Sequence, residues 1–229
     1  LAMVRKASNV HTPFDPTAAR RQFTIRTRDI GEVVYFPRIL KEVTKVAPGV
    51  RIRTTFQPID DTLSGLATGR IDLALGFLPS LETAIHRKVL FKQYYVCVMR
   101  KGHPLAKKKL THDLFRRQHH LLVEYSGSGH LVIEKALIEA GSRNNIKLRL
   151  PQYLSAPHFV ISSDMVWCAP VLLAETLAQH YDLVIKPVPL ELPTFEIALY
   201  WHDRFHRDPA NKWLRELIAQ IYGATLAGN

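Results

Sequence analysis

Cysteine is scarce in this chain. Its 229 residues contain two, Cys97 and Cys168, and both stand in apolar runs that are typical of buried strands. Reduced, buried thiols are therefore expected, and a fold held together by disulfides is not. No apolar run approaches the roughly 18 residues of a membrane-spanning helix, and the first residues lack the apolar core of a secretory signal. These absences predict a cytoplasmic protein with no membrane partner, and the start without Met suggests a fragment of a longer chain.

Acidic side chains are also few. The chain has 31 Lys and Arg against 20 Asp and Glu, a formal net charge of +11. A surplus of this size is common in proteins that associate with nucleic acid or another anionic partner. The positive residues are dispersed, however, and the densest run is 107–109. A solvated basic surface and a direct nucleic-acid face both remain open.

Motifs of enzyme chemistry are missing as well. The Gly-Ser segment 126–129 lacks the ordered acid and base of a nucleophile elbow, and it lacks the lysine of a phosphate-binding loop. His202 and His206 have a spacing that suggests metal binding, with Asp203 between them, but no motif supplies a third ligand. The sequence therefore predicts no enzyme, no metal site and no cofactor.

The chain does contain many strands that are followed by helices. The segment 23–40 begins with β-branched and aromatic residues and continues, after Asp29 as an expected N-cap, with apolar residues at helical spacing. A strand is expected at 50–58 and a nearly continuous apolar strand at 71–77, with a helix between them that Asp60 or Asp61 could cap. This order is typical of a doubly wound sheet.

The same theme returns in the second half, with strands expected at 147–154 and 165–170 and a helix after each. Two long extended runs, 88–100 and 193–202, bracket this second set. The sequence predicts an α/β fold of two Rossmann-like subdomains joined by two crossover hinge strands, like a type 2 periplasmic binding protein. Such a pair closes around a ligand in the cleft between the lobes.

The expected boundaries follow from these breaks. They are a linker at 1–20, subdomain I at 21–96 plus 203–229, and subdomain II at 97–202. The last helix is the clearest, because Asp208 can cap it and Pro209 suits its first position.

Several motifs resemble those of a known family. They are FDP at 14–16, RDIGEVVYFPRIL at 28–40, GRIDLALGFLP at 69–79, YYVCVMRKGHP at 94–104, GSGH at 127–130 and YWHDRFHRDPANKWLR at 200–215. Together they resemble the effector-binding domain of LysR-type transcriptional regulators, and more closely the NahR-like branch that responds to salicylate and nitroaromatic compounds. The resemblance implies a homodimer or homotetramer that binds a small aromatic inducer. It also implies that promoter DNA is bound by an N-terminal winged helix-turn-helix missing from this chain.

The resemblance also implies where the inducer binds. The expected ligand-binding residues are Arg28, Asp29, Pro58, Ile59, Phe77, Gln93, His130, Val171 and Leu172. Two of them depart from the family pattern. Arg28 stands where a neutral Ser or Thr is usual, and Leu172 stands near a position where the aromatic-acid branch can carry an arginine. With a cationic anchor on the other side of the cleft, a phenolate and a chlorinated aromatic remain candidate inducers in addition to salicylate.

The residues themselves allow two interpretations at most positions. Arg28 could bind a carboxylate or phenolate at the strand end, or it could form an ion pair with Asp29, Asp60 or Asp61. His130 could donate to an anion at a helix N-terminus or lie exposed in a capping loop. Gln93 could hydrogen-bond a polar ring substituent.

The aromatic residues Phe77, Phe91, Tyr35 and Phe159 could wall an aromatic pocket, although a place in the core is the simpler interpretation. Arg26, two residues before Arg28 on the same strand face, is expected to be a paired structural charge.

An inducer-sensing domain that alters promoter binding is the function that the sequence favours. The alternatives are a periplasmic solute-binding protein for a small organic anion, a two-lobed enzyme, and direct DNA binding by this fragment.

Overall fold

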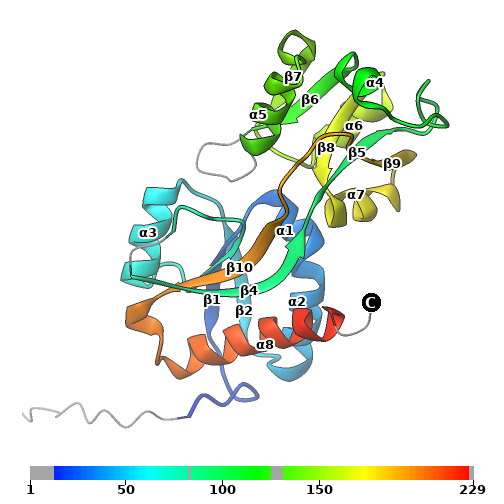
Figure 1. Cartoon of the computed structure of the whole chain (residues 1–229). Coiled ribbons are helices and arrows are strands. Elements are labelled where there is room, and N and C mark those ends of the chain that lie inside the picture. The colour runs from blue at the N-terminus through cyan, green and yellow to red at the C-terminus, as the bar shows by residue number, and fades with distance from the viewer. Residues whose placement is uncertain (1–12, 82–83, 125–130, 227–229) are drawn as a thin grey trace, which may run out of the picture.

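Two five-stranded mixed sheets organise the residues that the structure, a computed structural model, describes: 13–81, 84–124 and 131–226 (Figure 1). The first lobe contains β1 (Gln22–Arg26), α1 (Asp29–Val34), α2 (Phe36–Val46), β2 (Arg51–Thr55), α3 (Ile59–Thr68), β3 (Leu73–Gly76), β4 (Ile85–Gln93), β10 (Phe195–His202), η2 (Asp203–Phe205) and α8 (Pro209–Leu226). The second lobe contains β5 (Tyr95–Arg100), α4 (His112–Arg116), β6 (His119–Val123), α5 (Leu131–Glu139), η1 (Arg143–Asn145), β7 (Ile146–Leu150), α6 (Ala156–Ile161), β8 (Met165–Pro170), α7 (Val171–Ala178) and β9 (Leu183–Pro187).

The two sheets have the same plan. Their strand orders are β2-β1-β3-β10-β4 and β7-β6-β8-β5-β9. In each sheet the first three strands are parallel, and the fourth is antiparallel to both of its neighbours. The predicted α/β fold of two similar lobes is confirmed.

The chain crosses between the lobes twice. It leaves the first lobe at Tyr94, between β4 and β5, and returns through 188–194, between β9 and β10. The expected boundaries placed 195–202 in the second subdomain, whereas β10 pairs with β4 from Phe195 opposite Gln93 to His202 opposite Ile85. An extended apolar run does not reveal which sheet it will join, because ladder hydrogen bonds come from the backbone.

Helix boundaries in the first lobe differ from the expected ones. The single helix predicted after the strand in 23–40 is two helices that meet at Tyr35, because Pro37 has no N–H to continue the first helix. Asp29 is not the cap but the first helical residue. In α3 the cap position belongs to Pro58, and neither Asp60 nor Asp61 occupies it. The predicted cap of α8 is confirmed, since Asp208 Oδ1 accepts a hydrogen bond from Asn211 N at 2.7 Å.

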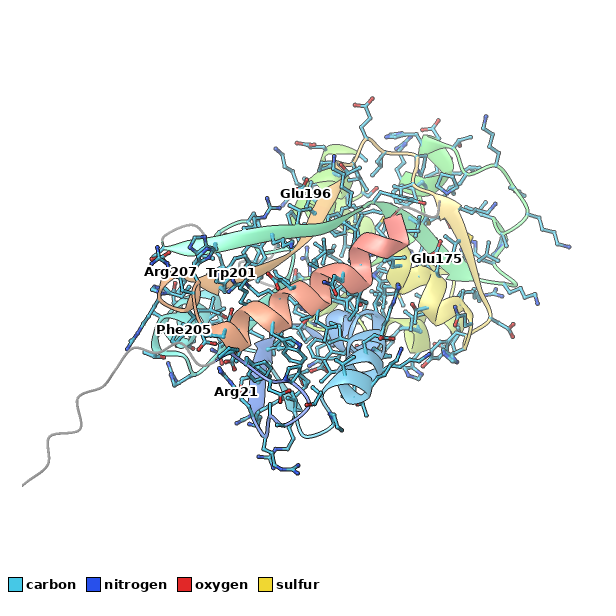
Figure 2. All side chains as sticks on the ribbon, turned by 90° about the horizontal axis from the view of Figure 1, so that it is seen from below. Arg21, Glu175, Glu196, Trp201, Phe205 and Arg207 are labelled. Atoms are coloured by element: carbon cyan, nitrogen blue, oxygen red, sulfur yellow. The ribbon has the colours of Figure 1, made fainter. Side chains whose placement is uncertain are left out.

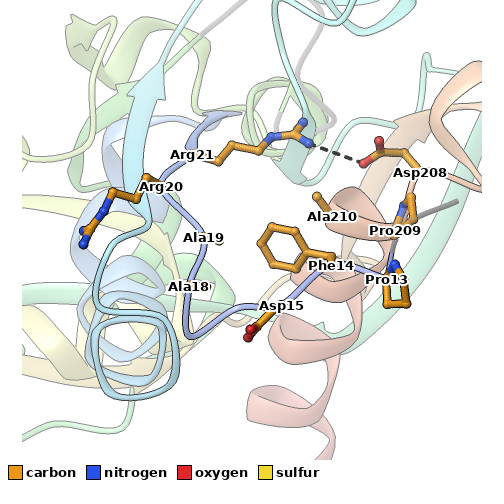
Figure 3. Close-up of a pocket in the computed structure, with 10 residues that line it drawn as sticks. All are labelled: Pro13, Phe14, Asp15, Ala18, Ala19, Arg20, Arg21, Asp208, Pro209 and Ala210. Carbon is orange, nitrogen blue, oxygen red and sulfur yellow. Dashed lines mark ion pairs between the residues drawn. The ribbon is translucent and has the colours of Figure 1, made fainter. Parts of the chain in front are cut away.

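The segment before β1 lies against the start of α8 in the part that the structure describes. The rings of Phe14 and Trp213 are 5.1 Å apart, and Arg21 Nη1 lies 3.5 Å from Asp208 Oδ1 (Figure 3). Residues 13–20 of the expected linker are therefore packed on the first lobe.

Both lobes share hydrophobic packing. One cluster of buried residues includes Tyr35 and Phe91 from the first lobe with Tyr95 and Cys97 from the second. A second cluster lies in the other lobe but takes in Ile30 of α1. Within the described residues, no helix is both long and apolar enough to cross a membrane.

Candidate ligand site at the lobe junction

The corner between β1 and α1 brings two charged side chains to the junction of the lobes. β1 lies between the parallel strands β2 and β3. Just after its end, Thr27 N donates to Thr55 O at 2.9 Å, and α1 begins two residues further on. The turn requires glycine at its third helical position, because a Cβ on Gly31 would lie 1.9 Å from Thr27 Oγ1. This tight turn directs Arg28 and Asp29 toward the second lobe.

Asp29 binds the backbone of the other lobe. Its Oδ2 accepts hydrogen bonds from Tyr153 N at 2.6 Å and Leu154 N at 2.9 Å, in the turn between β7 and α6. Charge-assisted hydrogen bonds of this kind are stronger than neutral ones. The carboxylate therefore holds the two lobes together instead of capping its own helix.

Arg28 reaches the same turn. Its Nη2 donates to Pro151 O at 2.5 Å, and its Nε lies 3.9 Å from Asp29 Oδ1. The rings of Phe56 and Tyr153 lie beside the guanidinium, with centroids 5.4 and 5.3 Å from Cζ. The side chain is 10% exposed. We call the bonds of Arg28 and Asp29 to residues 151–154 the interlobe contact.

The hinge forms a second connection. The buried Gln93 accepts a hydrogen bond through Oε1 from Leu172 N at 3.3 Å. Val171 N donates to Tyr94 O at 3.0 Å. The predicted hinge position and the predicted turn at the start of α7 are therefore in contact.

Phe77 belongs to a row of aromatic rings that crosses the hinge. Its ring lies 5.1 Å from that of Phe195, which in turn lies 4.7 Å from that of Tyr95 in the second lobe. Phe77 is half-buried. A row of packed aromatic rings thus connects the two lobes at the hinge.

The turn at Pro58 and Ile59 approaches the corner indirectly. Pro58 is exposed, and Ile59 packs against the cluster of Leu66 within the first lobe. Arg26, 1% exposed, donates to Gln57 O at 3.2 Å and so ties β1 to this turn. Its expected structural role agrees with this bond.

The remaining candidates have different outcomes. His130 lies outside the described residues. Tyr35 and Phe91 are core residues with rings 5.5 Å apart, as expected. Phe159 is 39% exposed on α6, so the core interpretation was wrong for this residue.

Buried phenols and a buried thiol near the junction stay in their neutral forms. Burial raises the pKa of Tyr153 and of Tyr95 above the usual value, so both phenols stay neutral. Burial also raises the pKa of Cys168 to about 12, which leaves a protonated, unreactive thiol. Among the described residues, no group of three or more His, Cys, Asp or Glu could hold a metal ion. Arg28 and Asp29 supply charged groups that bridge the lobes.

Sequence reasoning missed the partners of this pair. Pro151 O, Tyr153 N and Leu154 N are backbone atoms of a turn to which no ligand role was given. Backbone groups are the same at every residue, so no motif in the sequence identifies them.

Two similar α/β lobes that meet at a charged corner and a double hinge define a two-lobed ligand-binding domain. The family model of the LysR substrate binding domain matches residues 17–222. The chain therefore belongs to the LysR substrate-binding domain family.

Known relatives agree with this membership. The chain is 32% identical over 219 residues to the transcriptional activator NahR of Pseudomonas putida, covering 96% of this chain and 73% of that protein. It is 31% identical over 222 residues to the transcriptional activator NagR of a Ralstonia species, covering 97% and 74%. A crystal structure of a transcriptional regulator from Vibrio parahaemolyticus superposes with a TM-score of 0.83 at 27% identity, covering 93% of this chain and all of that one. These relatives are transcriptional regulators, and this chain is a regulatory domain, not an enzyme.

Proposed function

We propose that this domain senses a small aromatic acid or a chloro- or nitrophenol at the lobe junction of a cytoplasmic LysR-type regulator of aromatic-compound degradation. The observation that carries the proposal is the interlobe contact, where a guanidinium and a carboxylate of one lobe bind the backbone of the other. The domain forms a homodimer or homotetramer, and an N-terminal domain outside this chain binds promoter DNA.

The proposed mechanism is a shift in the relative position of the lobes. A guanidinium has five N–H donors, so an anionic group can bind Arg28 and compete with Pro151 O. The ring of the inducer would lie against the aromatic row that contains Phe77 and Phe195. Because binding to one arrangement of the lobes favours that arrangement, the inducer changes the population that the oligomer transmits to the DNA-binding domains.

Calorimetric titration of this domain with salicylate, benzoate, a nitrophenol and a polychlorinated phenol tests the proposal. One of these aromatic anions should bind, and Arg28→Ala should lose roughly 1.5–3 kcal/mol, since it removes a charged hydrogen bond. Arg53→Ala is the matched control, because Arg53 is an exposed arginine on β2 of the same lobe. It should bind the ligand as the unmodified domain does.

A second variant separates anchoring from lobe closure. Asp29→Asn weakens the hydrogen bonds to Tyr153 and Leu154 but leaves the cation of Arg28 in place. If Arg28 anchors the anion, Arg28→Ala should weaken binding more than Asp29→Asn does. Equal losses in the two variants would mean that Arg28 acts only through the interlobe contact. Binding by Arg28→Ala with unchanged affinity would reject the site.

A further inference from the structure

A polar hollow lies on the first lobe, away from the lobe junction. It has a volume of about 480 Å³ and lies between β4, the end of β10, the residues after η2, and the first turns of α8. Four cationic side chains and one carboxylate line it: Lys88, Arg207, Lys212, Arg215 and Glu216. Figure 2 shows Trp201, Phe205 and Arg207 gathered near the start of α8. The hollow therefore has an excess of positive charge.

Arg215 is fixed in this hollow by neutral groups. Its guanidinium donates to Asn211 Oδ1 at 2.7 Å and to His206 O at 2.8 Å, and it lies 4.4 Å from the centroid of Trp201. The residue is 6% exposed. Within the described part of the chain, no carboxylate lies within 4.0 Å of its nitrogens. Glu216 and Asp208 act on this guanidinium only from a longer distance, and burial outweighs their effect. Burying a charge is costly, so an anion in the hollow would stabilise it.

The other cations of the hollow are available to a ligand. Lys88 and Arg207 are exposed, and no described carboxylate pairs with either. Lys212 has only a long contact with Glu216, at 3.8 Å on the exposed side of α8. Such an exposed pair contributes little. Three flexible cations thus surround one rigid guanidinium.

His206 completes the wall with a defined tautomer. Its Nδ1 accepts a hydrogen bond from Trp201 Nε1 at 3.2 Å, which places the ring proton on Nε2. The imidazole also stacks on His86, with ring centroids 4.1 Å apart. Held in this way, His206 presents an N–H donor and not an acceptor for cations.

We propose that this hollow binds a tetrahedral oxyanion of the phosphate type, with Arg215 at its base and Arg207, Lys212 and Lys88 at its rim. Phosphate oxygens suit this set, because guanidinium and ammonium groups form charge-assisted hydrogen bonds with them. The phosphate group can belong to a free small molecule or to a DNA backbone. The site is independent of the inducer site at the lobe junction.

Titration with inorganic phosphate against chloride of equal ionic strength tests the site, with calorimetry and Trp fluorescence as readouts. We expect saturable binding, and an Arg207→Ala, Lys212→Ala double variant should weaken it at least about tenfold, since two charged contacts are lost. The control is Lys41→Ala with Lys45→Ala, which removes two exposed cations from α2 of the same lobe.

Binding no stronger than the chloride control, or an equal loss in both double variants, would overturn the site. A short duplex oligonucleotide distinguishes the sources of the phosphate group. If the duplex competes with phosphate, and if this competition is lost in the Arg207→Ala, Lys212→Ala variant, the site binds backbone phosphate. Phosphate binding that the duplex does not displace supports a site for a free anion.

Discussion

At the scale of single residues, His120 is a buried histidine in the second lobe. It is 1% exposed and its ring packs edge-on against Phe115 at 4.8 Å. Burial is the main cause that lowers the pKa of His120 from 6.5 to about 4, and the backbone of Phe115 partly opposes this effect. The folded protein therefore keeps this imidazole neutral at a pH where the unfolded chain protonates it.

The sign of the pH dependence follows. Between pH 4 and 6.5 the unfolded chain binds more protons at His120, so the stability that this residue contributes falls as the pH is lowered through this window. When the pH falls from about 7.5 to about 5, we expect the contribution of this residue to the free energy of unfolding to decrease by roughly 1–2 kcal/mol.

Urea unfolding at both pH values measures this effect. His120→Gln should show a smaller loss of stability on acidification than the unmodified chain. His112→Gln, at an exposed position of α4, should keep the full loss. The same pH dependence in all three proteins would contradict the assignment to His120.

The interlobe contact also depends on two single residues, Arg28 and Asp29. Arg28 is followed directly by an acidic residue, which favours a local ion pair on sequence grounds. In the structure the two groups are 3.9 Å apart at Nε and Oδ1, and their shorter bonds go to the other lobe. Neighbours in sequence thus act together across a domain boundary.

At the scale of elements, α8 is attached to the first sheet through Asn211. This buried side chain donates through Nδ2 to Asp72 O at 2.8 Å and accepts from Arg215 at 2.7 Å. Asp72 in turn accepts hydrogen bonds from Arg21 and from Thr24 N. The polar residues between 208 and 215 therefore have a structural role, in addition to the proposed anion site.

Asn211→Ala should lower the free energy of unfolding by roughly 2–4 kcal/mol, because it leaves a buried carbonyl and part of a buried guanidinium without partners. Thermal and urea unfolding measure the change. Asn144→Ala, at an exposed position of η1, is the matched control and should differ from the unmodified chain by less than about 0.5 kcal/mol. A similar effect for both variants would show that the network is not important for stability.

At the scale of the whole molecule, the lobes are connected by more than the two crossing segments. Tyr35 and Phe91 pack with Tyr95 and Cys97 in one cluster, and Ile30 enters the cluster of the second lobe. Separating the lobes would expose this apolar surface to water, which is unfavourable. The shared packing therefore opposes independent unfolding of either lobe.

We expect one cooperative unfolding transition for the chain. Hydrogen exchange followed by mass spectrometry, at increasing urea, should give the same midpoint for peptides from β1 and from β8. Two separate midpoints would mean that the shared packing is too weak to couple the lobes. In that case the interlobe contact would open before either lobe unfolds.

Local sequence patterns predicted much of this fold. Strands were predicted at 50–58 and 71–77, each next to a helical pattern, and the structure has β2 and β3 there, both parallel to β1. Asp208 and Pro209 correctly predicted the start of α8. These signals succeed because caps and period depend on residues that are close in sequence.

The sequence by itself therefore determined the family, the two-lobed α/β plan and the position of most strands. The tertiary structure alone decided that β10 joins the first sheet, that Asp29 binds Tyr153 N and Leu154 N, and that Arg28 binds Pro151 O. The physical reason is that these partners are backbone groups more than 100 residues away along the chain. Backbone groups have the same chemistry at nearly every position, so only folding determines which of them meet.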